Sequence, residues 1–115
     1  MRIIKKPWGH EEIWAETDKY CGKILYIQAG HRLSLQYHEK KTETIRVMQG
    51  TLHLTLRDSK GIVFDRKLQA GESYHVAPHT IHRFGAGDHD VVVVEVSTTE
   101  LDDVVRLEDD YTRST

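Results

Sequence analysis

The sequence predicts an all-β fold, and three observations indicate it. Hydrophobic and polar residues alternate with a period of two in several stretches that are rich in β-forming residues. Turn-forming residues separate these stretches at intervals of about 8 to 12 residues, as in antiparallel sheets. No long stretch between them has the helical periodicity that connects parallel strands. These features together favour a β-sandwich or a small barrel.

The elements follow from this pattern in chain order. Strands are expected where the alternation is clearest and where four valines follow one another, that is over residues 24–27, 32–38, 51–57 and 91–94. Turns are expected where Gly, Asp and Ser allow tight or positive-φ conformations, that is over residues 29–30, 49–50, 58–61, 70–72 and 85–88. Near the end, Ser97 and Glu100 match a helix capping box ahead of Leu101, which predicts a short C-terminal helical turn.

Length and composition narrow the class of protein. The 115 residues are enough for one domain, with boundaries expected at 1 and 115. Sixteen Lys and Arg against 18 Asp and Glu give a net charge of −2, so neither nucleic acid nor an anionic membrane is an expected partner. No apolar run approaches the roughly 20 residues of a membrane span. Cys21 is the single cysteine and residues 7–9 interrupt any signal-like segment, so we expect a cytoplasmic location.

A cluster of potential metal ligands is the main pointer to chemistry. Alternation places Arg32, Ser34, Gln36 and His38 on one face of a strand. Glu43 begins the next strand five residues after His38, and a hairpin there would bring its carboxylate beside the imidazole. Amide oxygen, imidazole nitrogen and carboxylate oxygen suit a divalent first-row metal, with a fourth ligand expected from another strand.

These residues resemble the two motifs of the cupin superfamily, G-x5-H-x-H-x4-E-x6-G and G-x5-P-x-G-x2-H-x3-N. The positions of the first motif are occupied without a gap by Gly30, Gln36, His38, Glu43 and Gly50. Gly71 and His82 stand at positions of the second motif, where Ala77, His79 and Ala86 replace its proline, glycine and asparagine. The resemblance implies a double-stranded β-helix, the cupin jelly roll, with Gln36, His38, Glu43 and His82 as ligands of one divalent ion: Zn, Mn, Fe, Co or Ni.

A narrower resemblance covers nearly the whole chain. The segments at 6–9, 33–38, 80–83 and 102–111 look like the cupin domain of type II mannose-6-phosphate isomerases. That family implies interconversion of mannose 6-phosphate and fructose 6-phosphate at the same Gln, His, Glu, His site. Lys41 stands where the family usually has an arginine associated with isomerase activity. Guanylyltransferase activity is not expected, because the chain has neither the length nor a Gly-rich phosphate loop for that domain.

The implied reaction assigns roles to further residues. A divalent ion would bind the C1 and C2 oxygens of the sugar, and Arg32, Lys41 or Arg83 would hold its phosphate. Lys41 is a candidate catalytic residue in place of the family arginine. The general base would be Glu43, His53, His79 or a metal-bound hydroxide, and the sequence does not choose among them.

Two other functions compete with the isomerase. A non-catalytic sugar or nucleotide-sugar binding protein would use the same pocket, and the change to Lys41 favours it. An iron-dependent dioxygenase would need a redox-active metal and open positions for oxygen. A homodimer is also expected, because the apolar side chains of Leu33, Leu35 and Tyr37 would otherwise face outward on a sheet.

Overall fold

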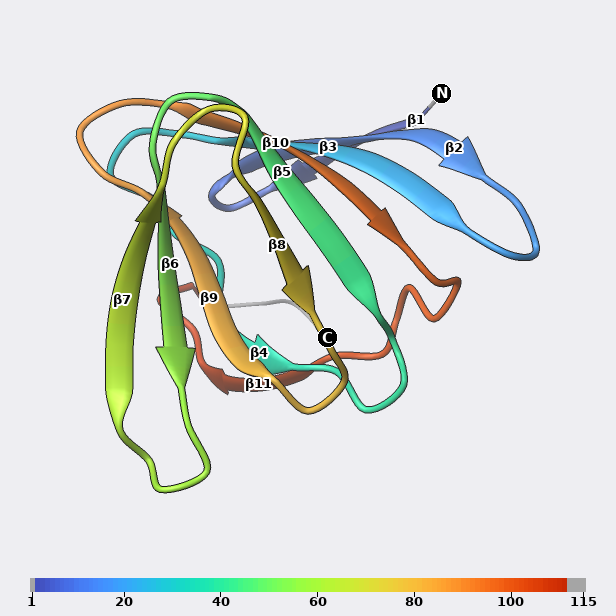
Figure 1. Ribbon diagram of the computed structural model, residues 1–115. Coiled ribbons are helices and arrows are strands. Elements are labelled where there is room, and N and C mark those ends of the chain that lie inside the picture. Colours follow the sequence, from blue (N-terminus) through green and yellow to red (C-terminus); the bar gives the residue numbers. More distant parts are fainter. Residues whose placement is uncertain (1, 112–115) are drawn as a thin grey trace.

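The chain folds into two antiparallel sheets that pack face to face (Figure 1). The computed structural model describes residues 2–111. The six-stranded sheet consists, in spatial order, of β1 (Arg2–Lys6), β2 (Gly9–Glu16), β3 (Cys21–Ile27), β10 (Val91–Ser97), β5 (Glu43–Gln49) and β8 (Ser73–Val76). The five-stranded sheet consists of β11 (Val105–Glu108), β4 (Leu35–Tyr37), β9 (Ile81–Ala86), β6 (Leu52–Arg57) and β7 (Val63–Leu68). The prediction of an all-β jelly roll is confirmed.

The period-two pattern explains which side chains fill the space between the sheets. In β6, Leu52, Leu54 and Leu56 point inward and are buried, while the residues between them are half-buried on the outer face. In β10, Val91 and Val93 are buried in the same way. Burying such side chains between two sheets is the main source of stability in a β-sandwich. The core therefore lies between the sheets, and in β6 the polar residues His53, Thr55 and Arg57 lie on the outer face.

Two glycines are required by close backbone contacts at the predicted turns and strand ends. Gly50 has φ +84°, and a Cβ there would lie 2.5 Å from the carbonyl oxygen of Asp90. Gly9 has φ +152°, and a Cβ there would lie 1.9 Å from the carbonyl oxygen of Tyr26. Both positions exclude any side chain unless the backbone moves.

The predicted C-terminal helical turn is wrong, because the segment after Ser97 makes tight turns and then a strand. Backbone bonds run from the N–H groups of Leu101, Asp103 and Val104 to carbonyl oxygens two or three residues earlier. The chain then enters β11, which pairs with β4. Pairing of Val105 and Arg106 with β4 satisfies backbone groups that a lone helical turn would leave to solvent. Residues 2–111 contain no helix that is long and apolar enough to span a membrane.

The predicted hairpin between His38 and Glu43 is also wrong. β4 pairs with β9 and β11, whereas β5 pairs with β10 and β8, so the loop between them crosses from one sheet to the other. The strand expected over 32–38 is shortened at its start, because the carbonyl oxygen of Leu33 accepts a hydrogen bond from the side chain of Arg83 at 2.8 Å. The two residues still meet, but across the space between the sheets.

The apolar face expected to drive dimerisation is covered within a single chain. Leu35 is buried, and Leu33 and Tyr37 are half-buried beside neighbouring segments. The addition of β11 beside β4 and the packing of Leu33 against the core account for this cover. The large apolar side chains that remain exposed include Trp14, Met48 and Val96 of the six-stranded sheet. A homodimer stays a prediction, with no support from the strand on which it was based.

Candidate metal centre

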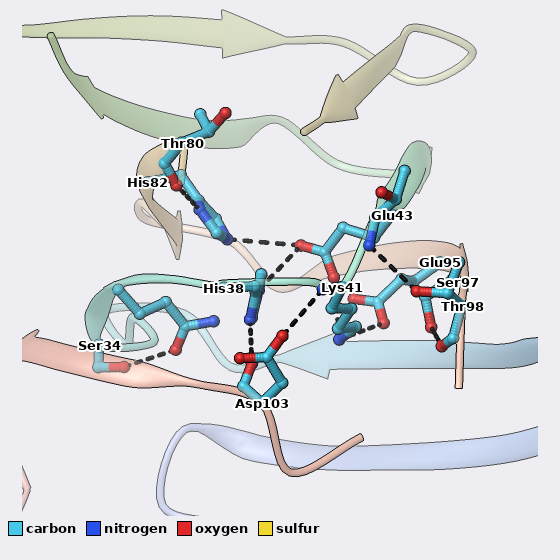
Figure 2. A network of polar contacts seen from close by, with 12 residues as sticks. Ser34, His38, Lys41, Glu43, Thr80, His82, Glu95, Ser97, Thr98 and Asp103 are labelled. Carbon is cyan, nitrogen blue, oxygen red and sulfur yellow. Dashed lines mark hydrogen bonds and ion pairs between the residues drawn. The ribbon is translucent and has the colours of Figure 1, made fainter. Parts of the chain in front are cut away.

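Three buried side chains from different segments converge between the two sheets (Figure 2). His38 follows β4, Glu43 begins β5 and His82 lies on β9. Glu43 Oε1 lies 3.4 Å from His82 Nε2 and 3.7 Å from His38 Nε2, and none of the three side chains is more than 3% exposed. Donor atoms bound to one ion at about 2.1 Å lie roughly 3.0 to 3.4 Å apart, so the trio is close to the spacing that a metal requires.

The orientation of both imidazoles directs a free nitrogen toward the same point. His38 Nδ1 donates to the carbonyl oxygen of Asp103 at 2.6 Å, and His82 Nδ1 donates to that of Thr80 at 2.8 Å. Because a carbonyl oxygen only accepts, each Nδ1 carries the hydrogen and each Nε2 presents a lone pair. The two Nε2 atoms and Glu43 Oε1 are buried without a hydrogen-bond partner. Each such orphan costs about 1 to 3 kcal/mol, and a cation among them would satisfy all three.

The second oxygen of Glu43 is fixed by Lys41. Lys41 Nζ lies 3.1 Å from Glu43 Oε2 and 3.4 Å from Glu95 Oε2, and all three side chains are buried. Burial alone would lower the pKa of the Lys41 ammonium, but the carboxylates of Glu95 and Glu43 outweigh it and raise that pKa. Burial alone would raise the pKa of Glu43, but the imidazoles and Lys41 hold it well below its usual range. Lys41 thus keeps Glu43 ionised and turns Oε1 toward the histidines.

Asp103, in the segment before β11, holds the loop of residues 39–41 between His38 and Glu43 in place. The Asp103 carboxylate accepts hydrogen bonds from the backbone N–H groups of Lys40, Lys41 and Glu39 at 2.7, 2.9 and 3.0 Å. These bonds lower the pKa of Asp103 from 3.8 to about 2. Its carbonyl oxygen also orients His38 (Figure 2). Sequence reasoning missed Asp103, since the interpretation of residues 97–105 as a capped helix gave it no role.

Gln36, the fourth predicted ligand, lies beside the trio. It stands directly opposite His82 in the β4–β9 ladder and lines the same pocket as His38 and Glu43. Its Oε1 accepts a hydrogen bond from Ser34 Oγ at 2.7 Å. Ligation through Gln36 therefore stays a prediction, while the other three predicted ligands do converge.

A pocket of about 310 Å³ opens beside the trio along the inner face of the six-stranded sheet. Charged side chains of alternating sign line it: Lys41, Glu95, Lys23, Glu11 and Lys6. Glu11 Oε1 lies 3.4 Å from Lys23 Nζ and 3.9 Å from Lys6 Nζ. Burial and the nearby Glu43 raise the pKa of Glu95 to about 7, although Lys41 and Lys23 oppose this. Such a pocket suits a polar molecule with many hydroxyl groups better than an apolar one.

Four other predicted site residues lie away from this pocket. The ring of His79 is exposed beside Tyr37, and its backbone N–H donates to the carbonyl oxygen of His38 at 2.7 Å. Arg32 and Arg83 line a separate pocket of about 240 Å³ on the outer face of the five-stranded sheet, together with His53. Asp110 holds Arg32 at 2.6 Å, and Arg83 bonds to the carbonyl oxygens of Leu33 and Glu108. Of the predicted phosphate-binding residues, only Lys41 faces the metal site.

The arrangement can hold one divalent ion and leave room for a substrate beside it. Two imidazole nitrogens and a carboxylate oxygen are typical donors for a catalytic first-row metal, and three protein donors leave coordination positions open. The pocket that adjoins the trio is lined by polar groups capable of binding hydroxyls. These features fit Lewis-acid chemistry on an oxygen-rich substrate.

Comparisons with known proteins identify the family. The mannose-1-phosphate guanylyltransferase ManC of Salmonella typhimurium is 30% identical over 97% of this chain, which spans only 23% of that protein. The D-lyxose/D-mannose isomerase of Thermosediminibacter oceani is 27% identical over 79% of this chain and 62% of its own length. The capsular polysaccharide assembling protein CapF of Staphylococcus aureus shares the cupin fold, with a TM-score of 0.81, 16% identity, and coverage of 93% of this chain and 34% of that protein. The family model "Mannose-6-phosphate isomerase C-terminal" matches residues 1–109, and the chain belongs to this family.

Proposed function

We propose that this domain is a divalent-metal-dependent aldose–ketose isomerase that interconverts mannose 6-phosphate and fructose 6-phosphate. The observation that carries the proposal is the trio of buried, unpartnered donor atoms on His38, Glu43 and His82 beside a polar pocket. Family membership and a relative named as a sugar isomerase support the same reaction class. A cytoplasmic location is part of the proposal, since the single cysteine, Cys21, offers no internal disulfide.

His38, Glu43 and His82, with Gln36 beside them, would hold the ion. A divalent ion bound there would supply Lewis-acid chemistry at the oxygens of the sugar's reacting end. Lys41 contributes by fixing the Glu43 carboxylate, so it acts as a positioning residue. Asp103 does the same for His38 through its carbonyl oxygen.

Isomerisation also needs a group that moves a proton between C1 and C2. The carboxylates that line the pocket besides Glu43 are Glu11, Glu95 and Asp102. Glu11 is held by two lysines, and Asp102 is exposed, whereas Glu95 is buried and shares Lys41 with Glu43. Its place next to the metal trio makes Glu95 the proton-transfer group of this proposal. His53 and His79, which sequence reasoning considered, lie outside the pocket lining.

Elemental analysis followed by a coupled assay tests this function. The wild type should carry about one ion per chain, and His38→Ala/His82→Ala should carry none. The matched control His75→Ala/His89→Ala changes two exposed histidines and should retain the ion. Metal-loaded wild type should convert mannose 6-phosphate, and Glu95→Gln should lose turnover while keeping the metal. Background activity with Mn, Co, Ni, Zn and Fe supplied in turn would refute the isomerase.

A binding protein without turnover is the second candidate. The observation that favours it is the burial of Lys41 between two carboxylates, where it offers the substrate less than a free arginine would. Tight binding of mannose 6-phosphate to metal-loaded protein, with no product by NMR after long incubation, would establish this alternative.

A further inference from the structure

Among residues 2–111, the exposed Arg106 of β11 has no hydrogen-bond or ion-pair partner, whereas the buried cations of the pocket are paired. Lys41 is held by Glu43 and Glu95, and Lys23 is held by Glu11. The guanidinium of Arg106 makes no hydrogen bond or ion pair within residues 2–111, although its side chain lines the pocket. The buried lysines near the metal trio are therefore neutralised by carboxylates, whereas the guanidinium of Arg106 at the exposed rim can still bind an anion.

The register of the five-stranded sheet aligns Arg106 with the metal site. Arg106 stands opposite Gln36 in the β11–β4 ladder, and Gln36 stands opposite His82 in the β4–β9 ladder. Directly opposed residues project to the same face of a sheet, so all three side chains point to the inner face. With neighbouring strands about 4.8 Å apart, the backbone of Arg106 lies roughly 10 Å from that of His82. The long side chain of Arg106 thus serves the region next to the metal trio, beyond Gln36.

The facing wall of the pocket adds positive charge. Arg2, Ile4 and Lys6 of β1 line the pocket together, as alternate residues of one strand do. The ion pair of Lys6 is long, with its Nζ 3.9 Å from Glu11 Oε1. Arg2 pairs at 3.2 Å with Glu16, which is exposed and does not line the pocket. The lining holds five cationic side chains against four carboxylates, and a divalent ion on the trio would add two more positive charges. This balance favours an anionic substrate over a neutral one.

We propose that Arg106, with Lys6 facing it, forms the phosphate subsite of this pocket and selects a phosphorylated sugar over the free sugar. This inference rests on the proposed function, because it assumes a sugar whose reacting end lies at the metal trio. The planar guanidinium can bind two phosphate oxygens at once, which fixes the far end of an open-chain sugar phosphate. In this role Arg106 takes the place that the sequence predicted for Arg32 and Arg83, which lie on the outer face of the same sheet.

The test compares Arg106→Gln with the matched control Arg46→Gln. Arg46 is an exposed arginine on the outer face of β5, outside the pocket lining. Inorganic phosphate is titrated into metal-free protein by calorimetry. Wild type and Arg46→Gln should bind it alike, and Arg106→Gln should bind about ten- to a hundredfold more weakly, as expected for loss of a bidentate charged contact. Equal affinity in all three proteins, or no binding by wild type, would overturn the subsite.

A kinetic comparison separates this inference from the isomerase itself. With metal-loaded protein, Arg106→Gln should lower kcat/KM for mannose 6-phosphate at least tenfold and leave kcat/KM for free mannose unchanged. Arg106→Lys should recover part of the loss, because it keeps the charge but not the fork. An equal loss for both sugars would overturn the subsite and leave the isomerase standing. An inactive wild type that loses phosphate affinity in Arg106→Gln would refute the isomerase and leave the subsite standing.

Discussion

Replacing Lys41 with methionine should destabilise the metal-free protein severely. The change removes the ammonium that lies 3.1 Å from Glu43 Oε2 and 3.4 Å from Glu95 Oε2, while both carboxylates stay buried. Removing one partner of a buried ion pair costs about 3 to 5 kcal/mol, because the remaining charge loses its compensation. For 115 residues, an unfolding entropy of about 0.24 kcal/mol/K converts this into a fall in Tm of about 12 to 20 °C.

Two further variants make the comparison specific. Lys40→Met alters the neighbouring lysine, which is exposed and contributes its backbone N–H to Asp103, so stability should change by less than about 0.5 kcal/mol. Lys41→Met/Glu95→Leu also removes one of the two carboxylates left without an ammonium and should recover part of the loss, since Glu43 stays buried beside the change. Urea unfolding of EDTA-treated protein measures all three. If Lys41→Met unfolds within about 1 kcal/mol of Lys40→Met, the argument that Lys41 neutralises two buried carboxylates is refuted.

Three further predictions address the metal, the Asp103 anchor and one turn. A divalent ion at 100 times its Kd should stabilise the wild type by about 2.7 kcal/mol in thermal unfolding, and His38→Ala/His82→Ala should show no such shift. The pKa of Asp103 is lowered to about 2 from 3.8, so its stabilisation is complete above pH 4 and is lost as the pH falls through 2; an NMR titration with a midpoint near 4 would contradict the three backbone hydrogen bonds. Gly50→Ala should cost at least twice as much stability as Gly61→Ala, because φ is +84° and +83° at the two sites but only Gly50 faces a backbone oxygen, that of Asp90; equal losses in urea unfolding would show that the contact is not limiting.

The ligand trio was predictable because its signal is local or motif-based. His38 and Glu43 are five residues apart, so their spacing alone suggests a shared site, and the resemblance to the second cupin motif adds His82. The route by which they meet was not predictable. A five-residue step fits a hairpin as well as a crossover between sheets, and only the pairing of β4 with β9 and β11 decides between them.

The roles of Asp103 and Arg106 depend on contacts that no local pattern reveals. Asp103 lies in the segment that the capping-box pattern of Ser97 and Glu100 indicated as helical, and Arg106 follows directly after that segment. The pairing of β11 with β4 overrides the local helical propensity of this segment. This pairing brings Arg106 opposite Gln36 and leaves Asp103 next to the loop at 39–41. The placement of Arg83 on the outer face follows from alternation with His82, but only once His82 is known to point inward.

The crossover between the sheets has a consequence for folding kinetics. His82 lies in the five-stranded sheet and His38 directly follows one of its strands, whereas Glu43 lies in the six-stranded sheet. A bound ion would therefore connect the two sheets of the sandwich. The complete set of donors exists only after both sheets have formed and closed on each other. An interaction completed that late lowers the rate of unfolding and leaves the rate of folding almost unchanged. A bound metal ion would thus slow the unfolding of a domain that has already folded.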